Sequence, residues 1–435
     1  MSSTSYGIGI IGCGTVGQGV LKLLDEQASL YAKRAGKPIE VKRILVRDAG
    51  RARDIPVSSD VFTDNADDFF NTPGMHAVVE VAGGIQPVGD YVRRSLSAGL
   101  HVITANKSLL AAHGPELFKL ARENNASIAF EASCGGGIPI VTALQCGLTA
   151  NSIESMYGIL NGTCNYILTQ MATHSKSYET ALKEAQEAGF AEADPFLDVS
   201  GTDAAQKLVI LASLAFGVQF QEDQAPCEGV DTVDLTDIRV AEELGYAVRL
   251  LAIAQRVDDG YALHVHPCFV HTTEPLAQVQ GSFNALSVFG HAVGHTLYFG
   301  RGAGQLPTAS AVVADLLNVA NGWYGQAFGS MNIWPDQQPV ASIRDRSDME
   351  TRYYLRIAAH DEPGVIAKVA KILGDESISI SAIHQKESDE EFVPVIITTH
   401  LAKEGAMANA IEKIASLDEV KGTPVRIRIV DFPEG

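Results

Sequence analysis

The sequence lacks the features that mark several large classes of protein. No run of about 18 apolar residues occurs, so no segment predicts a membrane-spanning helix. The six cysteines are scattered without a C-x-x-C pair, which indicates reduced thiols in a cytoplasmic protein rather than disulfides or a zinc site. Basic residues are also few. Lys and Arg number 33 against 52 Asp and Glu, and this formal net charge of −19 argues against nucleic acid or a membrane surface as a partner.

The length and composition of the chain are those of a globular protein with several domains. The chain has 435 residues, of which 46% are hydrophobic and 20% charged. Short apolar runs alternate with helical stretches over residues 1–150, which predicts a doubly wound, mostly parallel sheet. The first run, 6–11, ends in glycines and is followed by helical periodicity over 16–24. From 151 to 334 the pattern changes to α+β, with a helix predicted at 307–321.

The end of the chain predicts a separate small domain. Residues 335–350 are polar and predict a linker. Residues 351–435 give the order strand, helix, strand, strand, helix, strand. This βαββαβ order is typical of a ferredoxin-like fold.

A glycine motif follows the first predicted strand. Gly12-Cys13-Gly14-Thr15-Val16-Gly17 has the spacing G-x-G-x-x-G at the start of a predicted helix. The first glycine permits a tight turn, the second lets the backbone approach a pyrophosphate, and the third lets helix and strand pack closely. The pyrophosphate would lie at the helix N-terminus, among unpaired N–H groups. This context predicts a Rossmann-like, dinucleotide-binding domain; the alternative is a purely structural glycine turn.

Arg47 follows the predicted strand 41–46, at the position where such domains read the nucleotide ribose. An acid there favours NAD and an arginine favours NADP. Arg51 and Arg53 add positive charge nearby, so the sequence predicts NADP or the use of both cofactors. A solvated charged loop is the alternative.

Two further segments follow predicted strands. Lys107 lies between the strand 101–104 and a helical stretch predicted over 115–123, at the edge where open α/β sheets bind ligands. The run from Glu131 to Pro139 is rich in glycine, and its exposed carbonyls with Glu131 would suit a hard monovalent cation. An ordinary surface lysine and a tight glycine turn are the respective alternatives.

Acidic residues and one lysine gather between residues 192 and 207. They are Glu192, Asp194, Asp198, Asp203 and Lys207. Asp203 and Lys207 are four residues apart and therefore share one helix face. Lys207 adjoins an apolar run, so partial desolvation is expected, and this suits proton transfer. The carboxylates would suit a substrate ammonium group; an ordinary ion pair on a solvated face is the alternative.

These motifs, in this order, resemble homoserine dehydrogenases of the monofunctional bacterial type nearly end to end. The stretches that carry the resemblance are the glycine motif, Thr104 to Lys107, Asn161 to Tyr166, Glu192 to Asp198 with Asp203 and Lys207, Gly300 to Gly304, and Pro307 to Ala311. The last 85 residues resemble an ACT domain, with Asp361 to Val365 at its strand-to-helix turn.

The resemblance implies the reversible reduction of L-aspartate 4-semialdehyde to L-homoserine with NADPH or NADH, on the route to threonine, isoleucine and methionine. It implies that Lys207 donates a proton to the aldehyde oxygen and that Lys107 lies beside cofactor and substrate. Glu192 and Asp203 would hold the substrate, with Asp198 nearby.

The resemblance also implies cofactor, metal and effector sites. Gly83, Thr104 and Gly304 would contact the cofactor. Glu131, with the carbonyls of Cys134, Gly136 and Ile138, matches a sodium site. Asp361, Gly364 and Val365 would form part of an amino-acid site, with threonine as the expected effector. Such ACT sites commonly form between subunits, so a homodimer or homotetramer is expected, although a purely dimerising domain is an alternative.

Two other functions remain open on the sequence. A phosphorylating semialdehyde dehydrogenase would use Cys134 as its nucleophile, which requires a thiolate and a nearby base. A non-enzymatic amino-acid sensor would bind nucleotide and signal through the last domain without turnover. The pair Asp203 and Lys207 favours an enzyme that transfers a hydride directly.

Overall fold

The computed structural model of the chain describes residues 5–258, 260–385 and 391–433. The chain forms two compact units, each assembled from separate segments. Unit 1 comprises Met1–Gly162, Asp203–Pro226 and Ser282–Ala341, and unit 2 comprises Thr163–Thr202, Cys227–Gly281 and Ser342–Gly435.

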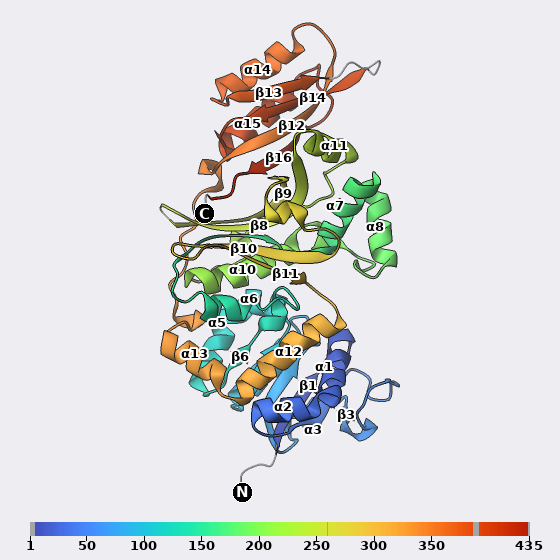
Figure 1. Ribbon diagram of the computed structural model, residues 1–435, viewed down its shortest axis with the longest axis vertical. Helices are drawn as coiled ribbons and strands as arrows, with labels where there is room; N and C mark the ends of the chain where they lie inside the picture. The colour runs from blue at the N-terminus through green and yellow to red at the C-terminus, as the bar shows by residue number, and fades with distance from the viewer. Residues whose placement is uncertain (1–4, 259, 386–390, 434–435) are drawn as a thin grey trace. The chain divides into compact units, whose positions relative to one another are not determined.

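Unit 1 is built on a six-stranded parallel sheet with the strand order β3-β2-β1-β4-β5-β6 (Figure 1). Every residue of β1 is buried, as expected of a central strand that is covered on both faces. The chain reverses its direction of progress between β1 and β4, and ligands bind at such switch points in doubly wound sheets. The strands are β1 (Tyr6–Ile11), β2 (Ile39–Leu45), β3 (Phe62–Thr63), β4 (Met75–Glu80), β5 (His101–Thr104) and β6 (Ile128–Ala129).

Several helices belong to unit 1, and one that packs against this sheet, α12, returns from late in the sequence. They are α1 (Thr15–Glu26), α2 (Ala28–Ala35), α3 (Ala66–Phe70), α4 (Val88–Ser97), α5 (Lys107–Glu123), α6 (Ile140–Thr142), α10 (Thr202–Phe216), α12 (Gln305–Ala320) and α13 (Trp323–Met331). In Figure 1 the orange α12 lies against the blue α1. Their backbones approach closely at Gly19, where an added Cβ would lie 2.8 Å from the carbonyl oxygen of Gln305.

Unit 1 also contains an antiparallel sheet of β7 (Ile153–Ile159), β10 (Phe283–Gly290) and β11 (Gly294–Arg301), with β10 in the middle. Along β11, alternate side chains are exposed, as the two-residue period of a strand dictates. Leu297 and Phe299 lie on the exposed face, 41% and 56% exposed, so this strand presents apolar side chains at the surface.

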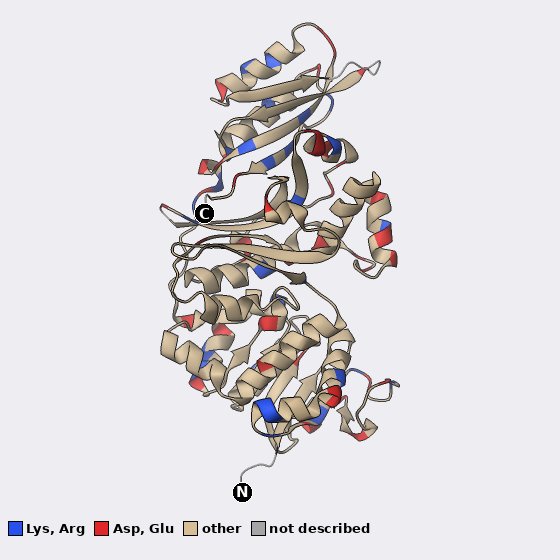
Figure 2. Cartoon of the chain, in the orientation of Figure 1, with Lys and Arg blue, Asp and Glu red and all other residues tan. Residues whose placement is uncertain are grey.

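Unit 2 contains a continuous sheet with the order β8-β9-β16-β12-β14-β13. Its strands are β8 (Tyr246–Val257), β9 (Gly260–His271), β12 (Glu350–His360), β13 (Ile380–Gln385), β14 (Phe392–Thr399), β15 (Ala402–Lys403), which pairs with β12, and β16 (Val425–Val430). Its helices are α7 (Gly162–His174), α8 (Tyr178–Glu187), α9 (Phe196–Val199), α11 (Leu235–Glu243), α14 (Val365–Asp375) and α15 (Glu404–Ala415). Acidic and basic residues are interspersed along α8 rather than separated by sign (Figure 2).

The predicted βαββαβ order of residues 351–435 is confirmed by β12, α14, β13, β14, α15 and β16. This domain is joined to the rest of unit 2 by strand pairing, because β16 runs parallel to β9 with Ile429 opposite Phe269. Asp237 links α11 to β12 by hydrogen bonds. Its buried carboxylate accepts hydrogen bonds from Arg356 Nε at 2.7 Å and from the Tyr354 hydroxyl at 2.9 Å, both on β12.

The doubly wound parallel sheet expected at the start of the chain is confirmed, and the predicted strands 6–11 and 101–104 coincide with β1 and β5. The helix predicted over 115–123 is longer than expected, because α5 begins at Lys107 and carries Pro115 in its interior. Within the described part of the chain, no helix combines the length and apolar character needed to cross a membrane.

Candidate active site

The glycine motif forms an open cradle between β1 and α1. Gly12 has φ +95°, and an added Cβ would lie 2.7 Å from the backbone of Ala82. Gly17 packs so closely that its Cβ would lie 2.6 Å from the Gly12 carbonyl oxygen. By contrast, a Cβ on Gly14, which begins α1, would meet nothing within 4 Å. No side chain caps α1 and no acid lies in its first turn, so its N–H groups suit a pyrophosphate.

Glu80, which the sequence analysis did not single out, organises the neighbouring loop. Its carboxylate is fully buried and accepts hydrogen bonds from the Gly83 amide at 3.0 Å and from the Thr104 hydroxyl at 2.6 Å. Asn106 caps the N-terminus of α5, with its side chain accepting from the Leu109 amide and donating to the Gly84 carbonyl. These bonds hold the ends of β4 and β5 in one arrangement at the ligand-binding edge. The only sequence signal for Glu80 is an acid at the end of an apolar strand.

The arginines after β2 lie near the glycine motif. Arg47 is exposed, whereas Arg53 is fixed by hydrogen bonds to the carbonyls of Asp48 at 2.9 Å and Arg51 at 2.8 Å. Burial raises the pKa of the Cys13 thiol, and the charge of Arg53 partly opposes this rise. The positive charge of Arg53 therefore acts on the glycine motif, where a nucleotide would lie.

The structure brings Lys107, Asp203 and Lys207 together. Asp203 is only 8% exposed. Its Oδ1 lies 3.0 Å from Lys107 Nζ, and its Oδ2 lies 2.7 Å from Lys207 Nζ. Burial alone would raise the pKa of Asp203, but the two lysine charges outweigh it and hold this pKa below its ordinary value. The prediction that Asp203 and Lys207 share a helix face is confirmed, and Lys107 from α5 completes the cluster.

A main-chain carbonyl and two asparagine side chains fix this cluster through hydrogen bonds. The sequence analysis assigned no role to them. Lys207 Nζ donates to the Leu160 carbonyl oxygen at 2.7 Å, and the same oxygen accepts from Asn284 Nδ2 at 3.0 Å. Asn161 Nδ2 donates to Asp203 Oδ2 at 2.9 Å. Leu160 and Asn161 follow β7, and Asn284 lies on β10, so the antiparallel sheet of unit 1 positions the lysine on α10.

Gly302 provides a test of this support. An added Cβ would lie 2.1 Å from Cγ and Nδ2 of Asn284. We expect Gly302→Ala to displace Asn284 from the Leu160 carbonyl, and this overpacking should lower the free energy of unfolding by about 1–3 kcal/mol. Turnover should fall by about tenfold, less than the roughly 10²-fold cost of a 1 Å misplacement of reacting groups, because Asn284 acts only through the Leu160 carbonyl. Steady-state kinetics and chemical denaturation would measure both effects.

Gly147→Ala is the matched control, because its Cβ meets nothing within 4 Å and the residue is exposed. Equal losses in the two variants would show that Asn284 does not position Lys207.

The turn after β6 is held by Glu131, which is 4% exposed. Its carboxylate accepts from the Val141 amide at 2.8 Å, and from the Thr142 amide at 2.8 Å and hydroxyl at 2.6 Å. Gly136, at φ +55°, packs against the Gly302 carbonyl. These bonds fix the Glu131 carboxylate against the first residues of α6, directly after the glycine-rich turn.

Two further observations concern the hypotheses of a metal site and of a cysteine nucleophile. Among residues 5–258, 260–385 and 391–433, no three His, Cys, Asp or Glu side chains gather as a metal site. Cys134 is completely buried, and burial raises the pKa of its thiol to about 12. A thiol of this kind is not a nucleophile at neutral pH, which argues against the phosphorylating alternative.

The acidic segment 192–201 belongs to unit 2. Glu192 and Asp194 are exposed, and Asp194 Oδ1 accepts from the Phe196 amide at 3.2 Å at the start of α9. Asp198 lies within α9, and its carbonyl oxygen is 3.2 Å from the thiol of Cys164 on α7. These contacts fix the backbone of the segment at the start and end of α9.

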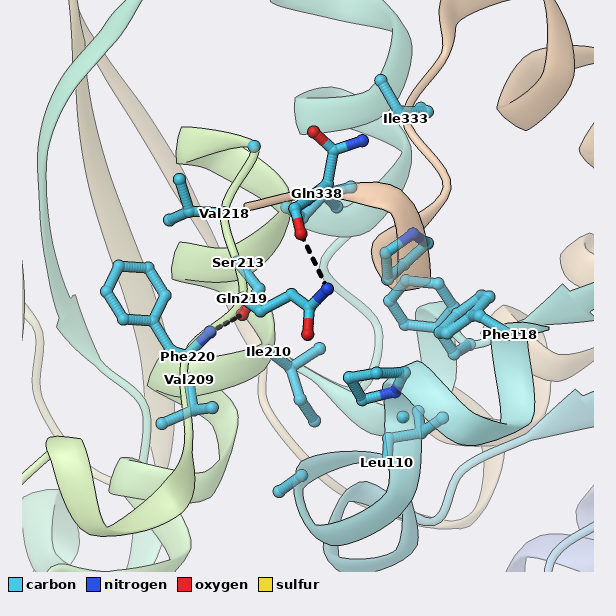
Figure 3. Close-up of a pocket in the computed structure, with 17 residues that line it drawn as sticks. Leu110, Phe118, Val209, Ile210, Ser213, Val218, Gln219, Phe220, Ile333 and Gln338 are labelled. Carbon is cyan, nitrogen blue, oxygen red and sulfur yellow. Dashed lines mark hydrogen bonds between the residues drawn. The ribbon is translucent and has the colours of Figure 1, made fainter. Parts of the chain in front are cut away.

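A separate cavity of about 80 Å³ lies between α5 and α10, lined by residues such as Leu110 and Ile210 (Figure 3). Its polar lining consists of Ser213, Gln219 and Gln338, and none of the described residues around it has an ionisable side chain. An apolar cavity that holds benzene has about 150 Å³, so this smaller and mostly apolar space does not suit a polar substrate.

In the ferredoxin-like domain, Gly364 begins α14 with φ +98° and leaves its first turn without a side-chain cap. Asp361 precedes it, and its Oδ1 accepts from Gln385 Nε2 on β13 at 2.8 Å. The three residues expected to contact an effector, Asp361, Gly364 and Val365, thus lie at the strand-to-helix turn.

Comparison with known families agrees with this geometry. Residues 12–131 match the NAD-binding domain of homoserine dehydrogenase, residues 139–317 match the homoserine dehydrogenase domain, and residues 353–419 match the ACT domain. Together these matches account for most of the chain.

Relatives match over nearly the whole length. The homoserine dehydrogenase of Pseudomonas aeruginosa is 42% identical over 430 residues, covering 97% of this chain and 98% of that protein. The enzyme of Bacillus subtilis is 36% identical, covering 96% and 97%. The crystal structure of a homoserine dehydrogenase from Thiobacillus denitrificans has a TM-score of 0.89 at 42% identity, covering 98% of both chains.

A hyperthermophilic archaeal homoserine dehydrogenase mutant, solved in complex with NADPH, has a TM-score of 0.61 at 26% identity and covers 73% of this chain and 98% of its own. The dinucleotide cradle, the Lys–Asp–Lys cluster and the full-length matches lead to one conclusion: the chain belongs to the homoserine dehydrogenase family, a family of NAD(P)-dependent oxidoreductases, and carries an ACT domain.

Proposed function

We propose that the protein interconverts L-homoserine and L-aspartate 4-semialdehyde with NADP(H), and that Lys207 transfers the proton. The observation that carries this proposal is the arrangement of Lys107, Asp203 and Lys207. Two of the three ammonium protons of Lys207 go to Leu160 and Asp203. Within the described part of the chain, this leaves the third proton for a substrate oxygen.

The residues suit the charge changes of this reaction. When bound, the nicotinamide supplies a hydride to the aldehyde carbon, or accepts one from homoserine. Hydride addition places a negative charge on the aldehyde oxygen, and Lys207 both stabilises that charge and gives up a proton to form the hydroxyl. Asp203 keeps both lysines in place. The family resemblance assigns Glu192 and Asp203 to the substrate, with Asp198 nearby.

The direct test incubates the purified protein with L-homoserine and NADP or NAD, and follows the absorbance of the reduced cofactor. We expect reduction that depends on homoserine. A protein that binds cofactor but reduces none of it with homoserine would contradict the proposal and favour the nucleotide-binding sensor.

We further propose that NADPH is preferred, because Arg47 is exposed beyond β2 where a 2′-phosphate would lie. Arg47→Ala should raise the KM for NADPH by roughly tenfold, since a charge-assisted bond to phosphate is lost. The KM for NADH should change less than about twofold. Lys22→Ala, an exposed cation on α1, is the control. Equal effects on both cofactors would rule out the phosphate contact.

For the turn at Glu131 we propose a sodium ion held by that carboxylate with the carbonyls of Cys134, Gly136 and Ile138. Support comes from the buried Glu131 carboxylate and the glycine-rich turn that follows it. Activity measured in sodium and in choline chloride at equal ionic strength would decide this. Equal activity in the two salts would leave Glu131 with only its role as the cap of α6.

We also propose that the ACT domain binds threonine and inhibits the enzyme. The effector carboxylate would lie at the uncapped N-terminus of α14, next to Gly364. Adding L-threonine to the assay, with D-threonine as the control, should lower the rate only for the L form. Unchanged rates would assign the domain to assembly alone.

Finally, we propose a homodimer or homotetramer. The exposed Leu297 and Phe299 on β11 support it, because apolar side chains grouped on one strand favour association. Light scattering on the purified protein would show the oligomeric state, and a monomer would contradict the proposal.

A further inference from the structure

We propose that Glu228 is a positioning residue through which the ACT domain holds the acidic segment 192–201. The inference rests on the substrate role proposed above for Glu192, with Asp198 nearby. Glu228 lies between α10 and α11 in the sequence, far from every motif that the sequence analysis selected. It contacts the ACT domain through its side chain and leads directly into the residues that fix the acidic segment.

On the ACT side, Glu228 is bound by arginines. Arg428 Nη1 lies 2.8 Å from Glu228 Oε2, and Arg426 Nη2 lies 3.1 Å from Glu228 Oε1. Both arginines are on β16, where basic residues are drawn as blue bands in Figure 2. Arg346, just before β12, also pairs with Glu228 Oε1. Three guanidinium groups from the ACT side therefore meet one carboxylate of the loop.

A second carboxylate balances this cluster from within the ACT domain. Glu404, at the start of α15, accepts from Arg426 at 2.8 Å and from Arg428 Nε at 3.0 Å. The cluster thus contains three positive and two negative groups. Burial alone would raise the pKa of Glu228, but the arginines hold this pKa at about 2, so the cluster stays ionised at neutral pH.

On the other side, the backbone next to Glu228 holds the end of the acidic segment. The Glu228 amide donates to the Val265 carbonyl on β9 at 2.8 Å, and the Val230 amide donates to the Val199 carbonyl at 3.0 Å. Between them, Gly229 approaches so closely that an added Cβ would lie 2.3 Å from the Val199 oxygen. Val199 directly follows Asp198, so a shift of the loop at Glu228 moves the backbone that carries this carboxylate.

These contacts give the ACT domain a physical route to the substrate residues. A displacement of β16 moves Arg426 and Arg428, and their bonds transfer that displacement to Glu228. Removing the Glu228 charge leaves three guanidinium groups facing Glu404 alone, and an incompletely paired cluster of this kind is strongly unfavourable. The loop at 228–230 would then separate from β16 and release residues 199–201.

The experiment compares Glu228→Gln with the wild-type full-length protein. Hydrogen exchange of amides in residues 192–201, measured without substrate, should become at least about tenfold faster. In kinetic assays the KM for homoserine should rise by roughly tenfold, with kcat changing less than about threefold. Inhibition by threonine should weaken in the same variant.

Glu419→Gln is the matched control, because Glu419 forms an exposed ion pair with Lys368 elsewhere in the ACT domain. It should leave exchange and KM unchanged. If Glu228→Gln does not fold, Arg346→Gln removes the most exposed member of the cluster and should show the same changes more weakly.

Unchanged exchange over 192–201 in folded Glu228→Gln, or equal changes in Glu419→Gln, would overturn the inference. Because exchange is measured without substrate, that result is distinct from a wild-type protein that fails to oxidise homoserine, which would overturn the proposed function instead.

Discussion

Replacing Lys207 with methionine is expected to lower kcat for homoserine oxidation by roughly 10²–10⁴-fold, the usual effect of removing a general acid–base group. Methionine keeps most of the length of the side chain and removes only the ammonium group. The carboxylate of Asp203 does not become an unpaired buried charge, because Lys107 and Asn161 still contact it. The loss should therefore reflect chemistry rather than collapse of the site.

Two further observations separate proton transfer from cofactor binding. The Kd for NADPH, measured by fluorescence titration, should stay within about twofold of wild type. Lys207→Arg keeps a positive charge but holds its proton too tightly, so its turnover should also remain low. Lys119→Met, an exposed position on α5, controls for the loss of a lysine. Near-normal kcat with weakened NADPH binding would remove Lys207 from the proton-transfer role.

The parts of this site that depend on local spacing could be predicted from the sequence. The glycine motif places its three glycines within one turn between a strand and a helix, and Asp203 and Lys207 share a helix face at a separation of four. The predicted position of Lys107 just past a strand end is also confirmed, because Lys107 starts α5 shortly after β5 ends. In each case the residues that matter are close in sequence, so their periodicity already fixes their geometry.

The supporting residues could not be found in this way, because their partners are distant in the sequence. Asn284 lies on β10 and acts through the carbonyl of Leu160 after β7, so it is visible only once the strands pair. A main-chain carbonyl has no sequence signature at all. Glu80 has no sequence signal beyond an acid at a strand end, because its bond from Thr104 forms only when β4 pairs with β5.

The boundary of the last domain shows a related limit. The polar residues 335–350 predicted a linker, and polar composition does distinguish this stretch from the strands around it. Composition cannot show that β16, near the end of the chain, pairs with β9. The pairing of β16 with β9 has a register that depends on both strands. This register also brings Arg428 next to Glu228. The contact between the ACT domain and the sheet that contains β9 can therefore be seen only in the structure.

Asp203→Asn is expected to affect both activity and stability, because Asp203 stands between two lysines. Loss of its charge leaves Lys107 and Lys207 without their shared counter-ion. The new amide group also faces the Asn161 amide donor. Breaking a buried ion pair from one side costs about 3–5 kcal/mol, so the free energy of unfolding at neutral pH should fall by an amount in that range. We expect kcat/KM to fall by roughly 10²–10³-fold, since Lys207 is no longer held.

The pH dependence distinguishes this ion pair from a general packing defect. The folded-state pKa of Asp203 lies below its unfolded value, so its contribution to stability is present above the unfolded pKa and is lost as the pH falls through the folded one. Wild-type stability should therefore decline on acidification, and Asp203→Asn should show a smaller decline over the same acid range. Glu222→Gln, which alters only a hydrogen bond to Gln206 on the same helix α10, should decline like wild type. Parallel acid profiles for wild type and Asp203→Asn would mean that the lysines do not stabilise the carboxylate, and the proposed cluster would then have no electrostatic basis.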